Sequence, residues 1–498
     1  MNIAMLLQMA AETSAERPAV TSHHNHHTYG QLYDGARNAA SIFRESGCRY
    51  VAMLDTSSPA VPMALMGAAL AGVPYVPLNY RLTRAQLDDL VSRISPLYLV
   101  ADEHNLAAYA DRDDITAISR DAFFEAVLGA QPPETEWPDD PSAIAVQLFT
   151  SGTTGPPKAA ILRHEHLVSY ILNTVEFMSA EDDEATLVSV PPYHIAGIAA
   201  VLSSLYACRR IVLLPEFGAA AWLELCEHEN VTNAFVVPTM LSRVVDHLDT
   251  VEHTADVPNL RAVAYGGGKM PVPVIERALT LFPDVAFTNA YGLTETSSTI
   301  ALLGPDDHRS AISSVDPPVR KRLGSVGQAL PSVEIEIRDE TGVPCPPGSP
   351  GEIYVRGPQV SGEYLERNAL DGDGWFPTRD AGFLDGEGYL YLSGRADDVI
   401  IRGGENISPA EVEDVLLTHP AVADAAIVAI PSMEWGEGVG AAVVLKPDGE
   451  ASEHELQQLV KSQLRSSRVP EVVRFERELP YNETGKLLRR VIKEWFAE

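Results

Sequence analysis

The sequence predicts an α/β fold built from several compact units, and three observations lead to this class. The chain has 498 residues, enough for about three domains of average size. Its 45% apolar and 21% charged residues are ordinary for a globular protein, which excludes a disordered chain, a collagen or a coiled coil. Short apolar runs alternate with amphipathic stretches through roughly the first 300 residues, a rhythm typical of parallel strands covered by helices.

This rhythm is clearest in the middle of the chain. Residues 211–214 and 234–237 have the apolar character of buried strands, and residues 219–229 and 239–248 have the periodicity of helices.

Nearer the N-terminus, the uncharged run 56–80 is interrupted by four prolines and two glycines, so a helix there cannot satisfy its backbone across a bilayer. We therefore predict no transmembrane segment, but a buried helix at 63–71 that stops at Gly72 and a buried strand at 75–78.

The pattern changes twice in the C-terminal half. From Gly324 to Ser393, short strands punctuated by Gly and Pro predict a small antiparallel β module. Beyond Arg395 we expect a compact α+β unit, with Ser408 as N-cap of a helix through Leu417 followed by strands at 425–429 and 441–445.

Charge argues against a nucleic-acid partner. The formal net charge is −32, and an acidic excess of this size repels a phosphate backbone. Residues 461–498 are the exception, with nine basic and six acidic side chains. Such a segment is either an ordinary solvated terminus or a cationic lid for an anionic ligand.

The cysteines and the N-terminus indicate a reducing compartment. Cys48, Cys208, Cys226 and Cys345 are too far apart for a CxxC motif and too few for a disulfide framework. The first 18 residues contain Glu12 and Glu16 and have no basic region before an apolar core, unlike a secretory signal, so we expect a cytoplasmic protein.

A loop rich in glycine and hydroxyl residues follows the apolar strand 144–148. It consists of Thr150, Ser151, Gly152, Thr153, Thr154 and Gly155, with Lys158 three residues later. Small residues of this kind expose backbone N–H groups to a polyphosphate, and the lysine adds a positive charge. The Walker A pattern does not fit, because Pro156 follows Gly155 and Ala159 follows Lys158. By composition alone, an ordinary Ser/Thr/Gly turn explains the loop equally well.

Together with four later segments, this loop resembles the phosphate loop of the adenylate-forming superfamily, which includes acyl-CoA synthetases, peptide synthetase adenylation domains and luciferases. The matching segments are NAYGLTE at 289–295, WFPTRD at 375–380, SGRADD at 393–398 with its continuation at 402–407, and NETGKLLRR at 482–490. Five motifs in the family's order are far more specific than any one alone, and the resemblance covers the whole chain.

The resemblance implies a domain arrangement. We expect a large N-terminal AMP-binding domain, residues 1–394, of two β-α subdomains plus a small β-barrel-like module. Residues 395–498 would form a small, mobile α+β C-terminal lid that turns about a hinge near Asp397. Alternatively, Asp397 and Asp398 form an ordinary solvated linker.

The resemblance also implies roles for individual residues in binding ATP. Thr150 to Lys158 would hold the β- and γ-phosphates, and Glu295 would hold Mg²⁺ together with Thr154 or a phosphate oxygen. Asp380 would accept hydrogen bonds from the ribose, and Arg395 would contact ribose or phosphate. Further nucleotide contacts fall on Gly266, Gly267, Gly268, Asn289, Ala290, Tyr291, Gly292 and Thr294. On the alternative interpretation, Glu295 is a surface carboxylate of a helix and Asp380 a turn residue.

Lys486 is the expected bridge between the substrate carboxylate and the α-phosphate. A lysine on a mobile domain suits this task because its charge arrives only when the lid closes. Its place within the net-positive segment favours the lid interpretation of that segment.

The acid and its acceptor are expected from two other segments. In residues 190–197, His194 would gate or orient the acyl group, unless it is a packed core histidine. Ala196 and Gly197, together with Gly266 to Gly268, imply an open apolar cavity for a medium or long aliphatic acid or an aryl acid.

Gly403 and Gly404 match the loop that approaches pantetheine, so coenzyme A is the expected acceptor. A separate carrier protein, an amine or nitrite are the alternatives. A nucleotide-binding regulator without catalysis is the alternative of another class, and the intact Lys486, Glu295 and Asp380 argue against it.

The departures from the family pattern are small. Ala159 stands where glycine is common and Arg379 precedes the ribose aspartate, whereas Asn406 replaces a phosphate-binding arginine of some relatives and leaves that contact open.

Three other patterns are weaker. The GxGxxA match at 436–441 precedes a strand where a dinucleotide fold needs it to follow one. The histidines at 23, 24, 26 and 27 suit a surface hairpin turn better than a metal site. Lys269 resembles a Walker lysine only superficially.

Overall fold

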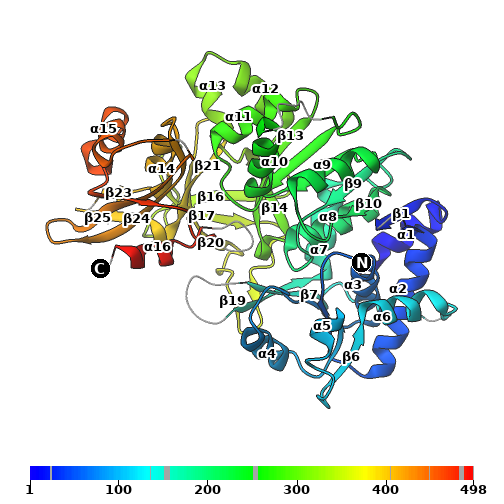
Figure 1. The fold of residues 1–498 in the computed structure, drawn as a ribbon. Coiled ribbons are helices and arrows are strands. Elements are labelled where there is room, and N and C mark those ends of the chain that lie inside the picture. Colours follow the sequence, from blue (N-terminus) through cyan, green and yellow to red (C-terminus); the bar gives the residue numbers. More distant parts are fainter. Residues whose placement is uncertain are drawn as a thin grey trace.

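Four β-sheets and their covering helices make up the described part of the chain (Figure 1). The structure is a computed structural model that describes residues 1–22, 25–134, 136–150, 157–250, 256–403, 405–447, 449–481 and 487–496. The mixed α/β class predicted from the sequence is confirmed, with two large sheets, a smaller antiparallel sheet and a C-terminal α+β domain.

The largest sheet has nine strands in the order β15-β14-β13-β12-β11-β9-β10-β1-β2. Its central strands are parallel, whereas β13–β14, β14–β15 and β1–β2 pair antiparallel. The strands are β1 (Pro18–Ser22), β2 (Asn25–Thr28), β9 (Ala185–Val188), β10 (Arg210–Leu213), β11 (Asn233–Val236), β12 (Ala262–Gly266), β13 (Ala286–Leu293), β14 (Ser298–Leu303) and β15 (Gln328–Ala329).

The second sheet has eight strands in the order β19-β18-β8-β7-β4-β3-β5-β6. The strands are β3 (Tyr50–Leu54), β4 (Tyr75–Pro77), β5 (Leu97–Ala101), β6 (Ile115–Ser119), β7 (Ile144–Thr150), β8 (Lys158–Arg163), β18 (Glu363–Tyr364) and β19 (Arg367–Asn368). Strand β18 comes from a segment two hundred residues after β8, so distant parts of the chain meet at this edge.

One apolar core lies between these two sheets. It joins side chains of β7, β9 and β10 to helices α1 (Ala4–Ser14), α2 (Tyr29–Ser46), α3 (Ala60–Ala71), α7 (His164–Thr174) and α8 (Ile195–Tyr206).

The outer faces have cores of their own. Helices α9 (Ala219–His228), α10 (Pro238–Thr250) and α11 (Val272–Leu281) cover the nine-stranded sheet. Helix α4 (Arg84–Arg93) packs on the eight-stranded sheet, α5 (Glu103–Leu106) contacts β5 and β6, and α6 (Arg120–Gly129) packs against α2. Helices on both faces of mostly parallel sheets explain the long apolar runs of their strands.

The third sheet is antiparallel, in the order β16-β17-β20-β21. Its strands are β16 (Glu334–Arg338), β17 (Gly351–Arg356), β20 (Phe376–Leu384) and β21 (Leu390–Arg395), and the helices α12 (Pro305–Ser313) and α13 (Pro317–Lys321) precede it.

The C-terminal domain has strands β22 (Ile400–Arg402), β23 (Glu405–Ile407), β24 (Val422–Ser432), β25 (Gly436–Leu445) and β26 (Val472–Glu476). Its helices are α14 (Pro409–Leu417), α15 (Glu453–Gln463) and α16 (Arg489–Trp495). The boundary at 394/395 and the hinge at Asp397 stay predictions.

Several predicted elements are confirmed within one to three residues. Helix α3 ends where Gly72 takes the left-handed conformation, with φ 72°, and Ser408 is the N-cap of α14. The histidine segment forms the β1–β2 hairpin, although His23 and His24 lie outside the described residues. The GxGxxA match was wrongly expected to precede a strand, because β25 already begins at Gly436 and contains the whole match. Within the described residues, no helix is long and apolar enough to cross a membrane.

Candidate active site

The phosphate-loop strand β7 pairs antiparallel with β8, and this pairing sets Thr150 opposite Lys158. The Thr150 hydroxyl donates to the Lys158 carbonyl at 3.4 Å. The predicted loop residues Ser151, Gly152, Thr153, Thr154 and Gly155 lie outside the described residues. Thr150 and Lys158, on either side of the loop, therefore lie next to each other where β7 ends and β8 begins.

Glu295 lies at the end of β13, in the short 3-10 helix Thr294–Thr296 that reverses the chain into β14. Ser297 and Ser298 complete the reversal with φ values of 58° and 115°, conformations that side chains other than glycine rarely take. Glu295 is only 9% exposed, and the Tyr364 hydroxyl donates to its Oε1 at 2.6 Å. A turn this tight fixes the carboxylate at the carboxyl end of a parallel strand, where α/β sheets bind ligands.

Asp380 is held between two donors. The Tyr291 hydroxyl donates to Oδ2 at 2.7 Å, and Nη1 of Arg395 lies 2.7 Å from Oδ1. Asp380 and Arg395 are direct cross-strand partners on β20 and β21. The structure thus brings Tyr291, Asp380 and Arg395 together from three of the predicted motifs, although the aspartate and arginine bind each other here.

Burial and charge shift the pKa values of these groups consistently. Burial, followed by the Glu295 charge, raises the pKa of Tyr364, and burial with Asp380 raises that of Tyr291. Burial is the largest single influence on Arg395 and lowers its pKa, but the charge and hydrogen bond of Asp380, together with Tyr291 and Glu295, raise that pKa overall. Both tyrosines therefore stay protonated donors and the arginine stays a cation at neutral pH.

Close backbone packing explains two of the glycines of this region, Gly266 and Gly292. A Cβ on Gly266 would lie 2.1 Å from the carbonyl oxygen of its partner Ala290, and one on Gly292 would lie 1.8 Å from that of Ser298. Gly267 has a φ of 84°, and both Gly267 and Gly268 are exposed. The Asn289 amide donates to the Ser325 carbonyl at 3.1 Å, which ties β13 to the segment before β15.

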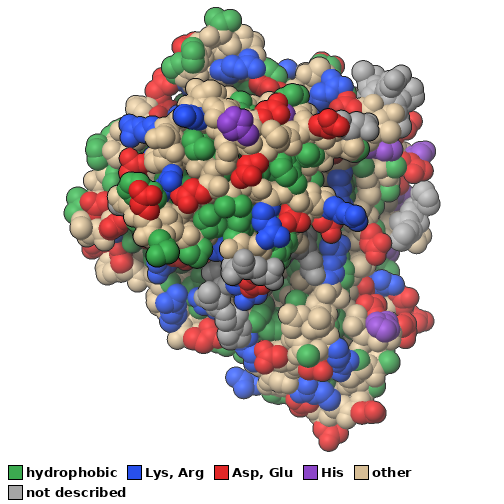
Figure 2. All heavy atoms as spheres, turned by 60° about the vertical axis from the view of Figure 1, so that its left-hand side comes forward, with side chains coloured by type: hydrophobic (Ala, Val, Ile, Leu, Met, Phe, Trp, Pro, Cys, Tyr) green, Lys and Arg blue, Asp and Glu red, His purple; other side chains and the backbone are tan. Residues whose placement is uncertain are grey.

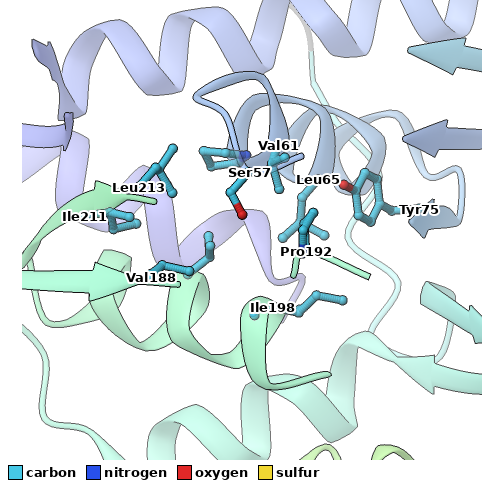
Figure 3. A pocket seen from close by; sticks show the side chains of 12 residues that line it. Ser57, Val61, Leu65, Tyr75, Val188, Pro192, Ile198, Ile211 and Leu213 are labelled. Carbon is cyan, nitrogen blue, oxygen red and sulfur yellow. The ribbon is translucent and has the colours of Figure 1, made fainter. Parts of the chain in front are cut away.

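His194 is the N-cap of α8, and its ring lies 4.5 Å from that of Tyr193, which in turn meets Tyr80 edge-on. Behind this segment, a narrow apolar cavity lies between α3 and β4 on one side and β9, α8 and β10 on the other (Figure 3). Gly197 and Pro192 line it, whereas Ala196 and Gly266 to Gly268 do not, so this is not the cavity expected between those two segments, which stays a prediction.

The only hydroxyls in the cavity wall are those of Ser57 and Tyr75, and the fully buried Tyr75 hydroxyl has no hydrogen-bond partner among the described residues.

Gly403 lies on the C-terminal domain, in the turn between β22 and β23, with a φ of 57°. Its N–H donates to the Trp435 carbonyl at 3.0 Å, and a Cβ there would lie 2.7 Å from the Trp435 ring. Gly404 and Lys486 lie outside the described residues. Lys269 bonds Asp414 of α14 at 2.6 Å, so the loop after β12 contacts the C-terminal domain.

On the face of the molecule that carries the C-terminal domain, basic and acidic side chains are interspersed and do not form separate patches (Figure 2).

Tyr364 and Thr378 contact the predicted site residues but were not among the candidates named from the sequence. The Thr378 hydroxyl accepts from the Asp380 N–H at 3.1 Å and donates to the Ile353 carbonyl. Thr378 belongs to the WFPTRD segment, so that motif contained a signal for it. Tyr364 stands in a two-residue strand outside every quoted motif.

Comparison with known proteins identifies the family of the chain. A family model described as AMP-binding enzyme matches residues 7–365, and the model of the AMP-binding enzyme C-terminal domain matches residues 411–486. The chain belongs to the AMP-binding enzyme family. It is 32% identical over 494 residues to the 2-succinylbenzoate–CoA ligase of Bacillus licheniformis, covering 97% of this chain and 98% of that protein.

Two solved structures of the family extend the comparison. The o-succinylbenzoate coenzyme A synthetase of Bacillus subtilis, solved with ATP and magnesium ion, is 29% identical with a TM-score of 0.84 and 99% coverage of both chains. The amide bond synthetase McbA from Marinactinospora thermotolerans is 29% identical with a TM-score of 0.87, again covering 99% of both. This AMP-binding enzyme is therefore a ligase of the AMP-forming acid–CoA ligase type, as the sequence motifs predicted.

Proposed function

We propose that this chain is an acyl-CoA synthetase that activates a medium or long aliphatic acid, or an aryl acid, as its adenylate and transfers the acyl group to coenzyme A. The observation that carries the proposal is the pair of carboxylates, Glu295 and Asp380, each fixed by a tyrosine near Lys158 and Arg395. Carboxylates and cations in fixed positions are what the transfer of an adenylyl group requires.

In the first half-reaction, a carboxylate oxygen of the acid attacks the α-phosphorus of ATP and the bond to pyrophosphate breaks. Lys158 and the Thr150 loop would attract the departing phosphates, and Lys486 would bridge the acid and the α-phosphate. Asp380 would accept from the ribose with the lone pairs that Tyr291 and Arg395 leave free.

The residues present fit a magnesium ion. Glu295 is a hard carboxylate ligand whose Oε2 takes no hydrogen bond from any described residue, and Thr154 of the loop would complete the pair. When bound, Mg²⁺ supplies charge neutralisation on the phosphates.

In the second half-reaction, the thiol sulfur attacks the acyl carbon, loses its proton and displaces AMP. The C-terminal domain would turn about Asp397 and bring Gly403 and Gly404 toward the pantetheine arm. His194 and the apolar segment after it would orient the acyl group.

One alternative keeps the same activation chemistry with another acceptor. The likeness to an amide bond synthetase over 99% of both chains favours an amine among these acceptors. A carrier protein or nitrite would use the same adenylate.

The deciding experiment measures pyrophosphate release from MgATP with a panel of aliphatic and aryl acids, with and without coenzyme A, and identifies products by mass. Acid-dependent release with an acyl-CoA product supports the proposal. Release that stops at the adenylate, or that yields an amide when an amine is supplied, transfers the function to the alternative. No acid-dependent release with any acceptor would contradict both.

A further inference from the structure

The segment from Ser361 to Tyr364 holds Glu295 at both its backbone and its side chain. The Ser361 and Gly362 N–H groups donate to the Glu295 carbonyl at 2.9 and 3.1 Å. The Tyr364 hydroxyl then donates to Oε1 at 2.6 Å. One short segment therefore fixes where this residue stands and how its carboxylate is turned.

The same segment is part of the sheet that carries the phosphate loop. Tyr364 pairs with Ala160 of β8, and the Leu365 N–H donates to the Ala159 carbonyl at 2.9 Å. The Lys158 ammonium, at the start of that strand, lies 5.9 Å from the centre of the Tyr364 ring. Tyr364 thus stands between the cation that closes the phosphate loop and the carboxylate of Glu295.

The two acidic residues of the site differ in one respect. Both oxygens of Asp380 have a partner, Tyr291 on one and Arg395 on the other. Glu295 has a partner on Oε1 alone, and no described residue donates to its Oε2. A glutamate side chain has three rotatable bonds, and a hydrogen bond on one oxygen fixes the direction of the other before any ligand arrives.

We propose that Tyr364 is a positioning residue that holds Oε1 of Glu295 and so leaves Oε2 as the oxygen for Mg²⁺. This inference rests on the proposed role of Glu295 as a metal ligand. It adds that Tyr364 of strand β18 sets the direction of the Glu295 carboxylate. Because β18 pairs with β8, this direction depends on the strand that follows the phosphate loop.

The test is the magnesium requirement for ATP binding in Tyr364→Phe. Calorimetric titrations use an ATP analogue that cannot be cleaved between the α- and β-phosphates, over a range of Mg²⁺ concentrations and without acid. We expect the Mg²⁺ concentration that gives half of the maximal gain in affinity for the ATP analogue to rise roughly tenfold. Loss of a residue that hydrogen-bonds a metal ligand typically weakens metal binding by this factor. Affinity for AMP without metal should stay within about twofold, because the hydroxyl that is removed contacts Glu295 and not the nucleoside residues.

Two further variants and a control separate loss of the Tyr364 hydrogen bond from loss of the Glu295 ligand itself. Glu295→Asp shortens the side chain by one methylene, so it cannot span Tyr364 and the metal together, and should raise the requirement similarly. In the Glu295→Gln background, Tyr364→Phe should add less than about twofold, because coupled residues are not additive. Tyr354→Phe on strand β17 is the control, since its ring stacks on Arg338, 4.5 Å away and outside this network.

An unchanged magnesium requirement in Tyr364→Phe would overturn the inference, as would an equal loss of AMP affinity, which indicates general damage to the site. If Glu295→Gln raises the requirement and Tyr364→Phe does not, only the positioning role fails. If Glu295→Gln also leaves it unchanged, the proposed metal role of Glu295 fails, and the positioning role with it.

Discussion

Tyr291→Phe removes a single hydroxyl that joins strand β13 to strand β20. The ring is 8% exposed and the hydroxyl donates at 2.7 Å to an aspartate that is 9% exposed, so water cannot readily replace the bond. A hydrogen bond to a charged group contributes about 1.5 to 3 kcal/mol, and most of this should appear because Asp380 loses a donor while buried. The phenylalanine ring fills the same space, so no cavity contributes.

The same loss should appear in ATP use. Asp380 keeps Arg395 on Oδ1 at 2.7 Å, but its second oxygen is no longer held, and the carboxylate can turn away from the position expected for the ribose. We expect the KM for ATP to rise about tenfold or more in pyrophosphate exchange, with a smaller change in kcat, because the affected contact exists before the transition state.

Urea unfolding and pyrophosphate exchange are measured on Tyr291→Phe beside Tyr354→Phe. The control tyrosine lies on β17, the strand paired with β20, and its hydroxyl makes no side-chain hydrogen bond among the described residues. A stability loss below about 0.5 kcal/mol with an unchanged KM for ATP would show that the Tyr291 bond does not hold Asp380, and the reasoning would be wrong.

Four other perturbations test separate features. Gly266→Ala should lower ATP affinity and stability much more than the control Gly386→Ala. The new Cβ at 266 would lie 2.1 Å from the Ala290 carbonyl oxygen, whereas a Cβ at 386 would have open space. Equal urea midpoints of the two variants would contradict this. His164 is buried with a pKa lowered to about 4, so the unfolded chain takes up the proton first and stability should fall by about 1.5 kcal/mol from pH 6.5 to pH 5. In His164→Asn that decrease should be smaller by this amount in urea titrations at each pH, and an identical pH slope would refute the burial argument. Asp414→Asn breaks a half-exposed ion pair with Lys269 that would stabilise one orientation of the C-terminal domain. The rates of the two half-reactions should therefore change in opposite directions, each by no more than about fivefold. Changes in the same direction would exclude a contact specific to one domain orientation. Lys486→Ala should abolish adenylate formation and leave transfer from a supplied acyl-adenylate largely intact, and survival of the first half-reaction would remove the assigned role.

The sequence predicted single elements well where the local signal was strong. Helix α3 was predicted from an apolar run ended by Gly72, and the left-handed φ of 72° at that glycine is the physical reason for the stop. The small antiparallel module at 324–393 was predicted because glycines and prolines separate short strands there, and the sheet β16-β17-β20-β21 occupies this segment. What local pattern does not contain is the pairing of β18 with β8, since nothing near Glu363 or Tyr364 refers to residues two hundred positions earlier.

The candidate site shows the same division between local and long-range information. Motifs identified Glu295 and Asp380, the acids with expected ligands, but identified the tyrosine partner only for Asp380. Tyr291 lies inside a motif because it is on the same strand that leads to Glu295, whereas Tyr364 reaches the site through a two-residue strand. Glu295 and Asp380, which are expected to touch a ligand, lie in motifs that can be recognised from the local sequence. Tyr364, which orients Glu295, reaches the site only because strand β18 pairs with β8, and no local sequence pattern contains that pairing. Substitutions along β18, and along β8 beyond Ala159, should therefore change the magnesium requirement without altering any recognisable motif.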